Sequence, residues 1–460
     1  MEKLDAAVEA LRDDMIETLR KWIRIPSEKL PPEPGAPFGK PLREMLTVAL
    51  SDAGRLGLAV RDFDGYIGDA GMGEGGEIMG ILAHLDVVPA GDGWKTDPFG
   101  ADIIDGKIYG RGTSDDKGPA VAALFAMKAV LDAGFTPKKK VRLILGCDEE
   151  SGWADIDHYK KHETMPDFGF SPDAEYPVIN TEKGLLQLRL TACCGCEEGA
   201  KLPVYGITSG ERPNVIPGLA TAEIGCDDFA GLQEALKATG LDVTAEKLES
   251  GHVKLTSVGT AGHASMPQCG KNAAGQLLLA MKAIGAGGGC RAFIEGLANG
   301  VGLDPSGKGL GVDGCDTISG PLTLNLGVLR VKPGSAMALL DIRHPVLMSG
   351  EMVKKIIAMR LQEAGVTVET AQYKAPLHVP AESKIVRSLL TVYTEATGEE
   401  GYTIAIGGGT YSRSMDNCVA FGCNFPGDPD LAHQAGECME IEKLVLNARI
   451  FARAIVRLAC

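Results

Sequence analysis

The feature that most constrains the fold is a short apolar run over residues 78–83, which ends in His84-Leu85-Asp86. Its length and composition are typical of a strand buried on both faces, and such strands belong to parallel sheets covered by helices. In open sheets of this kind, ligands bind beyond the carboxyl ends of the strands. The run therefore predicts an α/β domain with His84 and Asp86 at its functional edge.

Asp115 and Asp116 lie in the polar loop GRGTSDDKG, which opens a predicted helix over 119–133. Taken alone, acids at a helix start are explained by capping and the helix dipole, and a lone His-x-Asp by ordinary hydrogen bonding. Local chemistry does not separate the two aspartates. The two aspartates indicate a functional site only because acidic residues also follow other buried strands of the chain.

The pattern recurs after two further predicted strands. The strand over 141–146 leads into Cys147-Asp148-Glu149-Glu150, and the apolar run 168–170 leads to Asp173. Successive acids repel one another by about 1 kcal/mol or more per close pair unless a cation or a proton intervenes. The acidic run is therefore a stronger indication of a bound cation than His84 is.

Composition narrows the class of protein. With 460 residues, 45% of them hydrophobic, the chain predicts two or three globular domains. The absence of a long apolar run and of a signal-peptide core predicts a cytoplasmic protein whose twelve cysteines remain thiols. The net charge of −15, with no basic run beyond residues 138–140, argues against nucleic acid or a membrane as partner.

The pattern of apolar residues changes near Gly184. Before it, buried strands alternate with helices, starting from an amphipathic helix over 4–25; after it, half-exposed strands predict an antiparallel sheet with helices on one face. We therefore predict an α/β domain over 1–183 and 374–460, with a mixed, mostly parallel sheet and helices on both faces. An α+β domain over 184–373 is inserted into it.

Five candidate metal ligands follow the buried strands or precede the helices of the first domain and the C-terminal segment: His84, Asp115, Glu150, Asp173 and His433. Two imidazoles and three carboxylates suit zinc, manganese or cobalt. Three negative charges leave two divalent ions near neutral once a hydroxide bridges them. The set therefore favours two ions over one.

Six motifs, in order along nearly the whole chain, resemble the M20 family of dizinc peptidases, and within it the PepV-like bacterial dipeptidases. They are HLDVVPAGDGW, GRGTSDDKGP, GCDEESG, FSPDAEYPVINTEKG, GTAGHASMP and FPGDPDLAHQ. The resemblance implies that Asp115 bridges two zinc ions, the first held also by His84 and Asp173, the second by His433 and Glu150. It selects Asp115 over Asp116 by the family's Asp-x-Lys-Gly spacing alone.

The resemblance also implies that Glu149 is the general base and that Asp86 orients His84. Both roles agree with elementary chemistry, because a carboxylate outside the ligand set can carry the proton of an activated water. An outer carboxylate also commonly fixes the orientation of a ligating histidine.

In the insert, three residues match the family's lid positions. His263 would stabilise the developing oxyanion, and Asn214 and Arg343 would hold the substrate's terminal carboxylate, for which the planar guanidinium is suited. Their alternatives are structural: His263 could bond within its own turn, and Arg343 could form a salt bridge.

Other histidines and cysteines receive structural interpretations. His158 and His162 are spaced as a helical pair but lack a third ligand, so we interpret them as surface residues. Cys193-Cys194-Gly195-Cys196 is interpreted as a strand end followed by a tight turn, with a third metal site or a redox site as the alternative.

The leading functional hypothesis is a dipeptidase that uses two zinc ions, acts on small peptides and works as a monomer. An N-acyl amino-acid deacylase or a carboxypeptidase of the same family is the first alternative. The zinc motifs concern only the scissile amide and carry no information on how the ends of the substrate are recognised. The alternative from a different class, a catalytically inactive metal-binding protein, is disfavoured because Glu149 and all five ligands are present.

Overall fold

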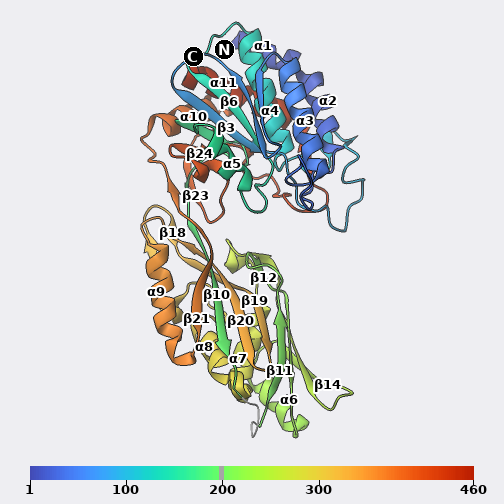
Figure 1. The fold of residues 1–460 in the computed structure, drawn as a ribbon, viewed down its shortest axis with the longest axis vertical. Helices are drawn as coiled ribbons and strands as arrows, with labels where there is room; N and C mark the ends of the chain where they lie inside the picture. The colour runs from blue at the N-terminus through green and yellow to red at the C-terminus, as the bar shows by residue number, and fades with distance from the viewer. Residues whose placement is uncertain (196–200) are drawn as a thin grey trace. The chain divides into compact units, whose positions relative to one another are not determined.

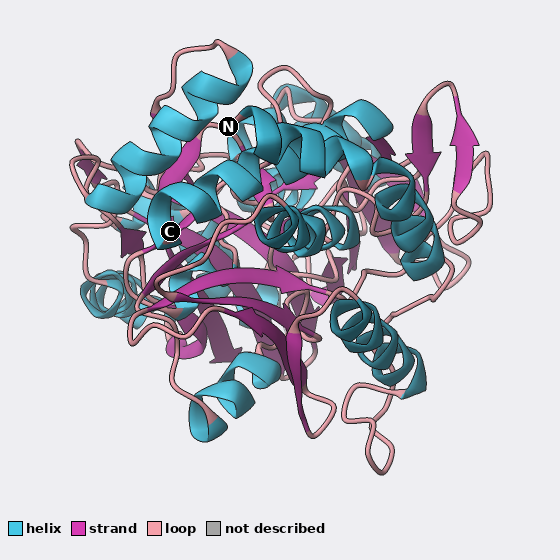
Figure 2. Ribbon diagram, turned by 90° about the horizontal axis from the view of Figure 1, so that it is seen from above, coloured by secondary structure: helices cyan, strands magenta, loops and turns pink. Residues whose placement is uncertain are grey.

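The computed structural model describes residues 1–195 and 201–460, which form two compact units (Figure 1). The first unit comprises Met1–Asn180, His378–Ile404 and Gly409–Cys460, and the second comprises Thr181–Leu377 and Ala405–Gly408. This division falls a few residues from the boundaries that we expected at 183/184 and 373/374. Figure 2 shows the helices in cyan and the strands in magenta.

The first unit is an α/β domain. Its helices are α1 Glu2–Ala10, α2 Arg12–Ile23, α3 Lys40–Arg55, α4 Lys117–Asp132, α5 Ala154–His162, α10 Lys384–Thr397 and α11 Ile441–Ala459. The strands found in or next to it are β1 Ala59–Phe63, β2 Ile67–Met72, β3 Ile78–His84, β4 Asp102–Ile104, β5 Lys107–Tyr109, β6 Lys140–Gly146, β7 Phe168–Ser171, β8 Ala174–Glu175, β9 Val178–Glu182, β22 Leu377–His378, β23 Thr403–Ile406, β24 Cys418–Ala420, β25 Cys423–Asn424 and β26 Cys438–Glu440.

The main sheet is mixed, in the order β1-β2-β6-β3-β7-β24-β9-β22, with β23 also paired to β9. Its central strands β6, β3, β7 and β24 are parallel, whereas β1 with β2 and β2 with β6 are antiparallel. Every residue of β3 is buried, and its last residue, His84, pairs with Gly146 at the end of β6. The carboxyl ends of these two strands therefore coincide.

Helices cover both faces of this sheet, as expected. Leu82 and Ile144 lie on one face and pack against Ile156 and Tyr159 of α5. Helix α4 packs against β3, β6 and α11, and almost all of its residues are buried. Because it is enclosed by the sheet and by other helices, α4 is apolar around its whole circumference, as a buried helix should be.

Two elements of the first unit differ from the sequence prediction. The helix expected over 4–25 is two helices, α1 and α2, separated at Leu11. The glycine-rich stretch before β3 contains strand β2, which was not predicted. A Cβ atom at Gly68 would lie 2.9 Å from Leu50, so glycine allows α3 to approach this strand closely.

The second unit is an α+β domain built on an antiparallel eight-stranded sheet, in the order β14-β15-β13-β11-β19-β20-β10-β21. Its strands are β10 Gly184–Cys193, β11 Val204–Ser209, β12 Val215–Ile216, β13 Leu219–Ile224, β14 Val243–Lys247, β15 Val253–Val258, β16 Gly262–His263, β17 Cys315–Asp316, β18 Gly320–Pro321, β19 Thr323–Lys332, β20 Ser335–His344 and β21 Thr367–Lys374. Its helices are α6 Phe229–Ala238, α7 Ala273–Ile284, α8 Arg291–Gly300 and α9 Gly350–Leu361. Helix α8 was not predicted.

Cys194 and Cys290 form a disulfide in the second unit, which contradicts the expectation that all cysteines are thiols. Cys193 ends strand β10, as the strand-end interpretation requires, and Cys196 lies outside the described residues. Among the helices that the structure describes, none is by itself long and apolar enough to cross a membrane.

Candidate metal centre

Asp115 faces one histidine with each of its carboxylate oxygens. Its Oδ1 lies 2.9 Å from Nε2 of His84, and its Oδ2 lies 3.0 Å from Nε2 of His433. Two ligand atoms that share a tetrahedral zinc ion at bond lengths of 2.0–2.1 Å are separated by roughly 3.3 Å. The arrangement of Asp115 between two imidazoles therefore suits a carboxylate that bridges two ions.

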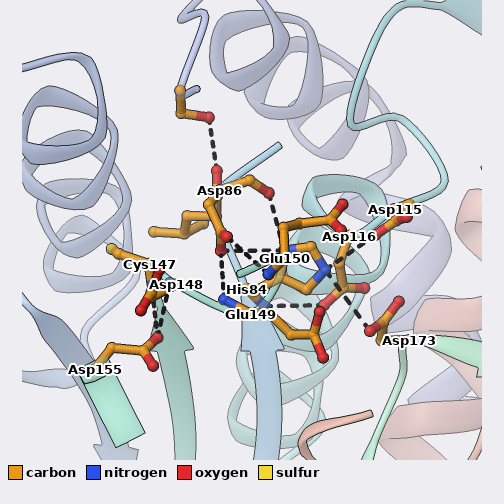
Figure 3. Close-up of polar contacts among 12 residues, drawn as sticks. His84, Asp86, Asp115, Asp116, Cys147, Asp148, Glu149, Glu150, Asp155 and Asp173 are labelled. Atoms are coloured by element: carbon orange, nitrogen blue, oxygen red, sulfur yellow. Dashed lines mark hydrogen bonds and ion pairs between the residues drawn. The ribbon is translucent and has the colours of Figure 1, made fainter. Parts of the chain in front are cut away.

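Two acids complete the surroundings of the histidines. Asp173 Oδ2 lies 3.7 Å from His84 Nε2, and Glu150 Oε1 lies 2.9 Å from His433 Nε2. Figure 3 shows His84 joined by dashed lines to Asp115 and Asp173. The structure thus brings together all five residues that the sequence suggested as ligands.

The sheet explains why these residues meet. His84 ends β3, Glu150 follows β6, and Asp173 follows β7, so three parallel neighbours deliver them to one edge. Asp115 precedes α4, and His433 lies in the loop after β25 with a φ of 63°. This is the edge at which α/β sheets bind ligands.

Glu149 and Glu150 belong to different groups of possible ligands. Its carboxylate forms a group with His84 and Asp173, whereas Glu150 forms a group with Asp115 and His433; in each group the ligand atoms lie within 4.8 Å of one another. Glu149, the expected base, therefore lies beside His84 and Asp173, while Glu150 is the acid that accompanies His433.

Asp86 contacts His84 with both its backbone oxygen and its carboxylate. His84 Nδ1 lies 2.9 Å from the backbone oxygen of Asp86, and 3.4 Å from its carboxylate. The carboxylate accepts hydrogen bonds from the backbone amides of Glu149, at 3.2 Å, and Glu150, at 3.0 Å. Asp86 thus lies against the imidazole with its backbone oxygen and its carboxylate, and the carboxylate also holds the loop that carries the two acids.

Asp116 is distinguished from Asp115 by its contacts. It is fully buried, and its Oδ2 accepts the backbone amide of His84 at 3.0 Å. It therefore fastens the end of β3, while Asp115 alone faces both histidines.

The chain matches the model of peptidase family M20/M25/M40 over residues 80–457. The chain belongs to the M20 family. It is accordingly a peptide-bond hydrolase, and M20 enzymes are metallopeptidases.

Two curated relatives cover 98% of this chain. One, from Bacillus subtilis (strain 168), is named "Putative dipeptidase YtjP"; it is 38% identical, with 99% of its own length matched. The other, from Lactobacillus delbrueckii subsp. lactis, is a Beta-Ala-Xaa dipeptidase, 36% identical, with 97% of its length matched. The solved structure of human carnosine dipeptidase 1 has the same fold, with a TM-score of 0.62, 16% identity, and coverage of 99% of this chain and 98% of that one.

Electrostatics within this M20 centre favour a cation. Burial opposes charge on His433, but its contacts with Asp115 and Glu150 outweigh burial and raise its pKa to about 11. Burial and the nearby charge of Asp115 raise the pKa of Asp173 and of Glu150. The crowded acids are thus stabilised by protons on the imidazoles, and divalent ions can replace those protons.

Glu437 also contributes to the centre, a role that the sequence did not predict. This fully buried carboxylate accepts backbone amides of Gly112, Ser114 and Asp115 at 3.0, 2.9 and 3.2 Å, and it pairs with the buried Arg111 at 2.5 Å. It therefore fixes the loop that presents Asp115. Its only sequence signal is an acid in the segment between His433 and the closing helix, which does not reveal its partners.

Asp148 has a structural role. It is fully buried and pairs with Lys29 at 2.5 Å, and it accepts the backbone amide of Ala154 at 2.9 Å. Of the acidic run, only Glu149 and Glu150 therefore belong to the metal centre.

His263 and Asn214 come together in the second unit. His263 pairs with Val215 between β16 and β12, and the Asn214 carbonyl accepts the Ala264 amide at 2.9 Å. Nδ1 of His263 accepts the backbone amide of Ser265 at 3.2 Å. Because a backbone amide can only donate, this neutral imidazole carries its hydrogen on Nε2 and is oriented as a donor through that atom.

Arg343 is buried in the same unit and makes the salt bridge that we considered as its alternative. Its Nε donates to Asp341 Oδ1 at 2.6 Å and its Nη2 to Asp341 Oδ2 at 3.2 Å, while Nη1 donates to the Gly407 carbonyl at 2.9 Å. Its role toward a substrate carboxylate remains a prediction.

Proposed function

We propose that the chain is a dipeptidase that works with two zinc ions held by His84, Asp115, Glu150, Asp173 and His433. The observation that carries the proposal is the position of Asp115, with one carboxylate oxygen on each histidine. Manganese or cobalt would suit the same mixed nitrogen and oxygen ligands. When bound, the ions supply a water of lowered pKa and polarise the scissile carbonyl.

Glu149 is the proton carrier in this proposal. It lies beside His84 and Asp173 without serving as the acid of the His433 group, so it can take a proton from the attacking water and deliver it to the leaving amine. Asp86 holds the backbone of Glu149 and thereby the direction of its carboxylate. His263 supplies an Nε2 hydrogen to the oxyanion of the tetrahedral intermediate.

Dipeptides are the proposed substrates because the two full-length relatives at 36% and 38% identity are named as dipeptidases. Asn214 and Arg343 are the proposed contacts for the substrate carboxylate. A deacylase or a carboxypeptidase would use the same centre, and an inactive metal-binding protein would not require Glu149.

The test is a substrate panel assayed with the zinc-loaded chain. It contains dipeptides, tripeptides, N-acetyl amino acids and dipeptides with a blocked amino or carboxyl end. A dipeptidase hydrolyses the free dipeptides and is much slower on every blocked form. Preference for N-acetyl amino acids would identify a deacylase, equal rates on longer peptides a carboxypeptidase, and no turnover by zinc-loaded protein an inactive chain.

We also propose that the catalytic form is a monomer. The inserted domain spans about 184–373, and its described residues form an eight-stranded sheet with four α-helices. An insert of this size can provide within one chain the lid residues that a smaller insert would obtain from a partner.

A further inference from the structure

We propose a separate divalent-cation site, formed by Asp64, His158 and His162 at the end of α5. These three residues form a group whose ligand atoms all lie within 4.8 Å of one another. None of them belongs to the centre described above. The inference does not depend on the proposed function.

The two histidines occupy one face of α5, a single turn apart, at its carboxyl end. Their rings stack with centroids 4.2 Å apart at 29°, and the other neighbour of His158 is Tyr66, stacked at 4.2 Å and 7°. Tyr66 in turn meets Phe38 edge to face at 5.3 Å. The stack restrains both imidazoles, so less side-chain entropy is lost when they bind an ion.

Hydrogen bonding directs the donor atoms. Nδ1 of His162 lies 2.9 Å from the backbone oxygen of His158, which can only accept. His162 Nδ1 therefore carries a hydrogen, and the lone pair of the neutral ring is on Nε2, the atom available to a metal. Nε2 of His158 lies 3.1 Å from Asp64 Oδ2, close to the roughly 3.3 Å expected for two ligands of one tetrahedral zinc ion.

Asp64 comes from the turn between β1 and β2. It has a φ of 56° and is followed by Gly65 with a φ of 77°, a left-handed pair typical of tight hairpin turns. The turn places its carboxylate against a helix that lies far along the chain. The third ligand is not on the helix, so the helical spacing of the two histidines does not predict it.

An ordinary histidine and carboxylate pair elsewhere in the chain offers a comparison. His252 lies 2.5 Å from Glu223 and stacks on Tyr205 at 4.1 Å and 10°. It belongs to none of the candidate metal groups found among the described residues, whereas His158 has a second imidazole beside it. His252 and Glu223 form only an ion pair, whereas His162 adds a third ligand to His158 and Asp64, so that this group can chelate an ion.

Two imidazoles and one carboxylate, partly exposed to solvent, match the three protein ligands and open positions of zinc, cobalt or nickel. A bound ion would join the end of α5 to the β1–β2 turn. At its other end, α5 carries Asp155, which accepts the amides of Cys147 at 2.7 Å and Asp148 at 3.0 Å, just before Glu149. The ion would thus stabilise the helix that anchors the catalytic loop.

The first test counts bound zinc. The full chain is stripped with a chelator and equilibrated with buffered free Zn²⁺, and zinc per chain is measured by mass spectrometry for the parent and for Asp64→Asn, His162→Ala and His252→Ala. We expect the first two variants to lose one equivalent and His252→Ala to match the parent. Equal zinc in all four proteins would overturn the proposal.

The second test reports on individual residues and needs no variant. The parent is treated with diethyl pyrocarbonate with and without Zn²⁺, and the modified histidines are mapped by peptide mass spectrometry. Zinc should protect His162 and leave His252 reactive. Equal modification of His162 in both conditions would show that it does not bind the ion.

Discussion

Glu149 and Glu150 are consecutive residues whose carboxylates belong to different ligand groups of one centre. Their backbone amides are held by the same carboxylate, that of Asp86, at 3.2 and 3.0 Å. Because successive residues in this loop present their side chains in different directions, one acid joins His84 and Asp173 and the other joins His433 and Asp115. Substituting these two residues one at a time therefore tests proton transfer separately from metal binding.

Glu149→Gln should retain both ions and lose roughly 10²- to 10⁴-fold in turnover, the usual contribution of a general base. Glu150→Gln should instead lose metal from the His433 group, and Asp115→Ala should lose metal from both. Metal analysis beside kinetics on zinc-loaded protein checks all three. Parent-like activity of Glu149→Gln would mean that another group carries the proton.

His263→Ala should reduce kcat by roughly 10²- to 10³-fold, because an oxyanion donor acts on charge that develops only in the transition state. KM should change little. Ser265→Ala is the matched control, since it removes the hydroxyl beside Nδ1 but leaves the backbone amide that sets the tautomer. A raised KM with unchanged kcat in His263→Ala would assign this histidine to substrate binding instead.

Glu437→Gln should destabilise the fold by about 3–5 kcal/mol, because it leaves Arg111 as an unpaired buried charge. It should also weaken metal binding through the loop that presents Asp115. Denaturant unfolding and zinc titration measure the two effects. The control is Glu442→Gln at the exposed pair with Arg12, which should leave both quantities unchanged; a parent-like Glu437→Gln would contradict the positioning role.

Metal affinity should increase with pH between 6 and 8. In the metal-free chain the contacts of His433 raise its pKa from 6.5 to about 11. The stabilisation that this proton gives the metal-free fold is therefore complete below pH 6.5, and it is lost as the pH rises through about 11. An ion must displace this proton, and affinity therefore gains roughly tenfold per pH unit for each proton displaced. Calorimetry in buffers of different ionisation enthalpy counts the protons; pH-independent affinity would rule out this exchange.

Light scattering at assay concentration should give the mass of a single chain. Mixing Glu149→Gln with His263→Ala chains should restore no activity, because each centre would use the lid of its own polypeptide. Recovery of activity on mixing would show that active sites are shared between chains, and the monomer proposal would then be wrong.

The amino-acid sequence was sufficient to predict the α/β fold with its inserted domain and the residues that meet at the centre. It could do so because β3 is buried on both faces and reads as one apolar run, and because a parallel sheet collects the residues that follow its strands at one edge. The M20 motifs then selected Asp115 by spacing. Element ends and the helix break at Leu11 were less predictable, because packing and not periodicity decides them.

The tertiary structure was needed to identify the partner of each polar residue. It distinguished Asp115 from Asp116 by their contacts, placed the backbone oxygen of Asp86 against the imidazole of His84, and paired Glu437 with Arg111. It also brought Asp64 to His158 and joined Cys194 to Cys290. Hydrogen bonds and ligand sets of this kind depend on distances between atoms of remote segments, which no local pattern of residues contains.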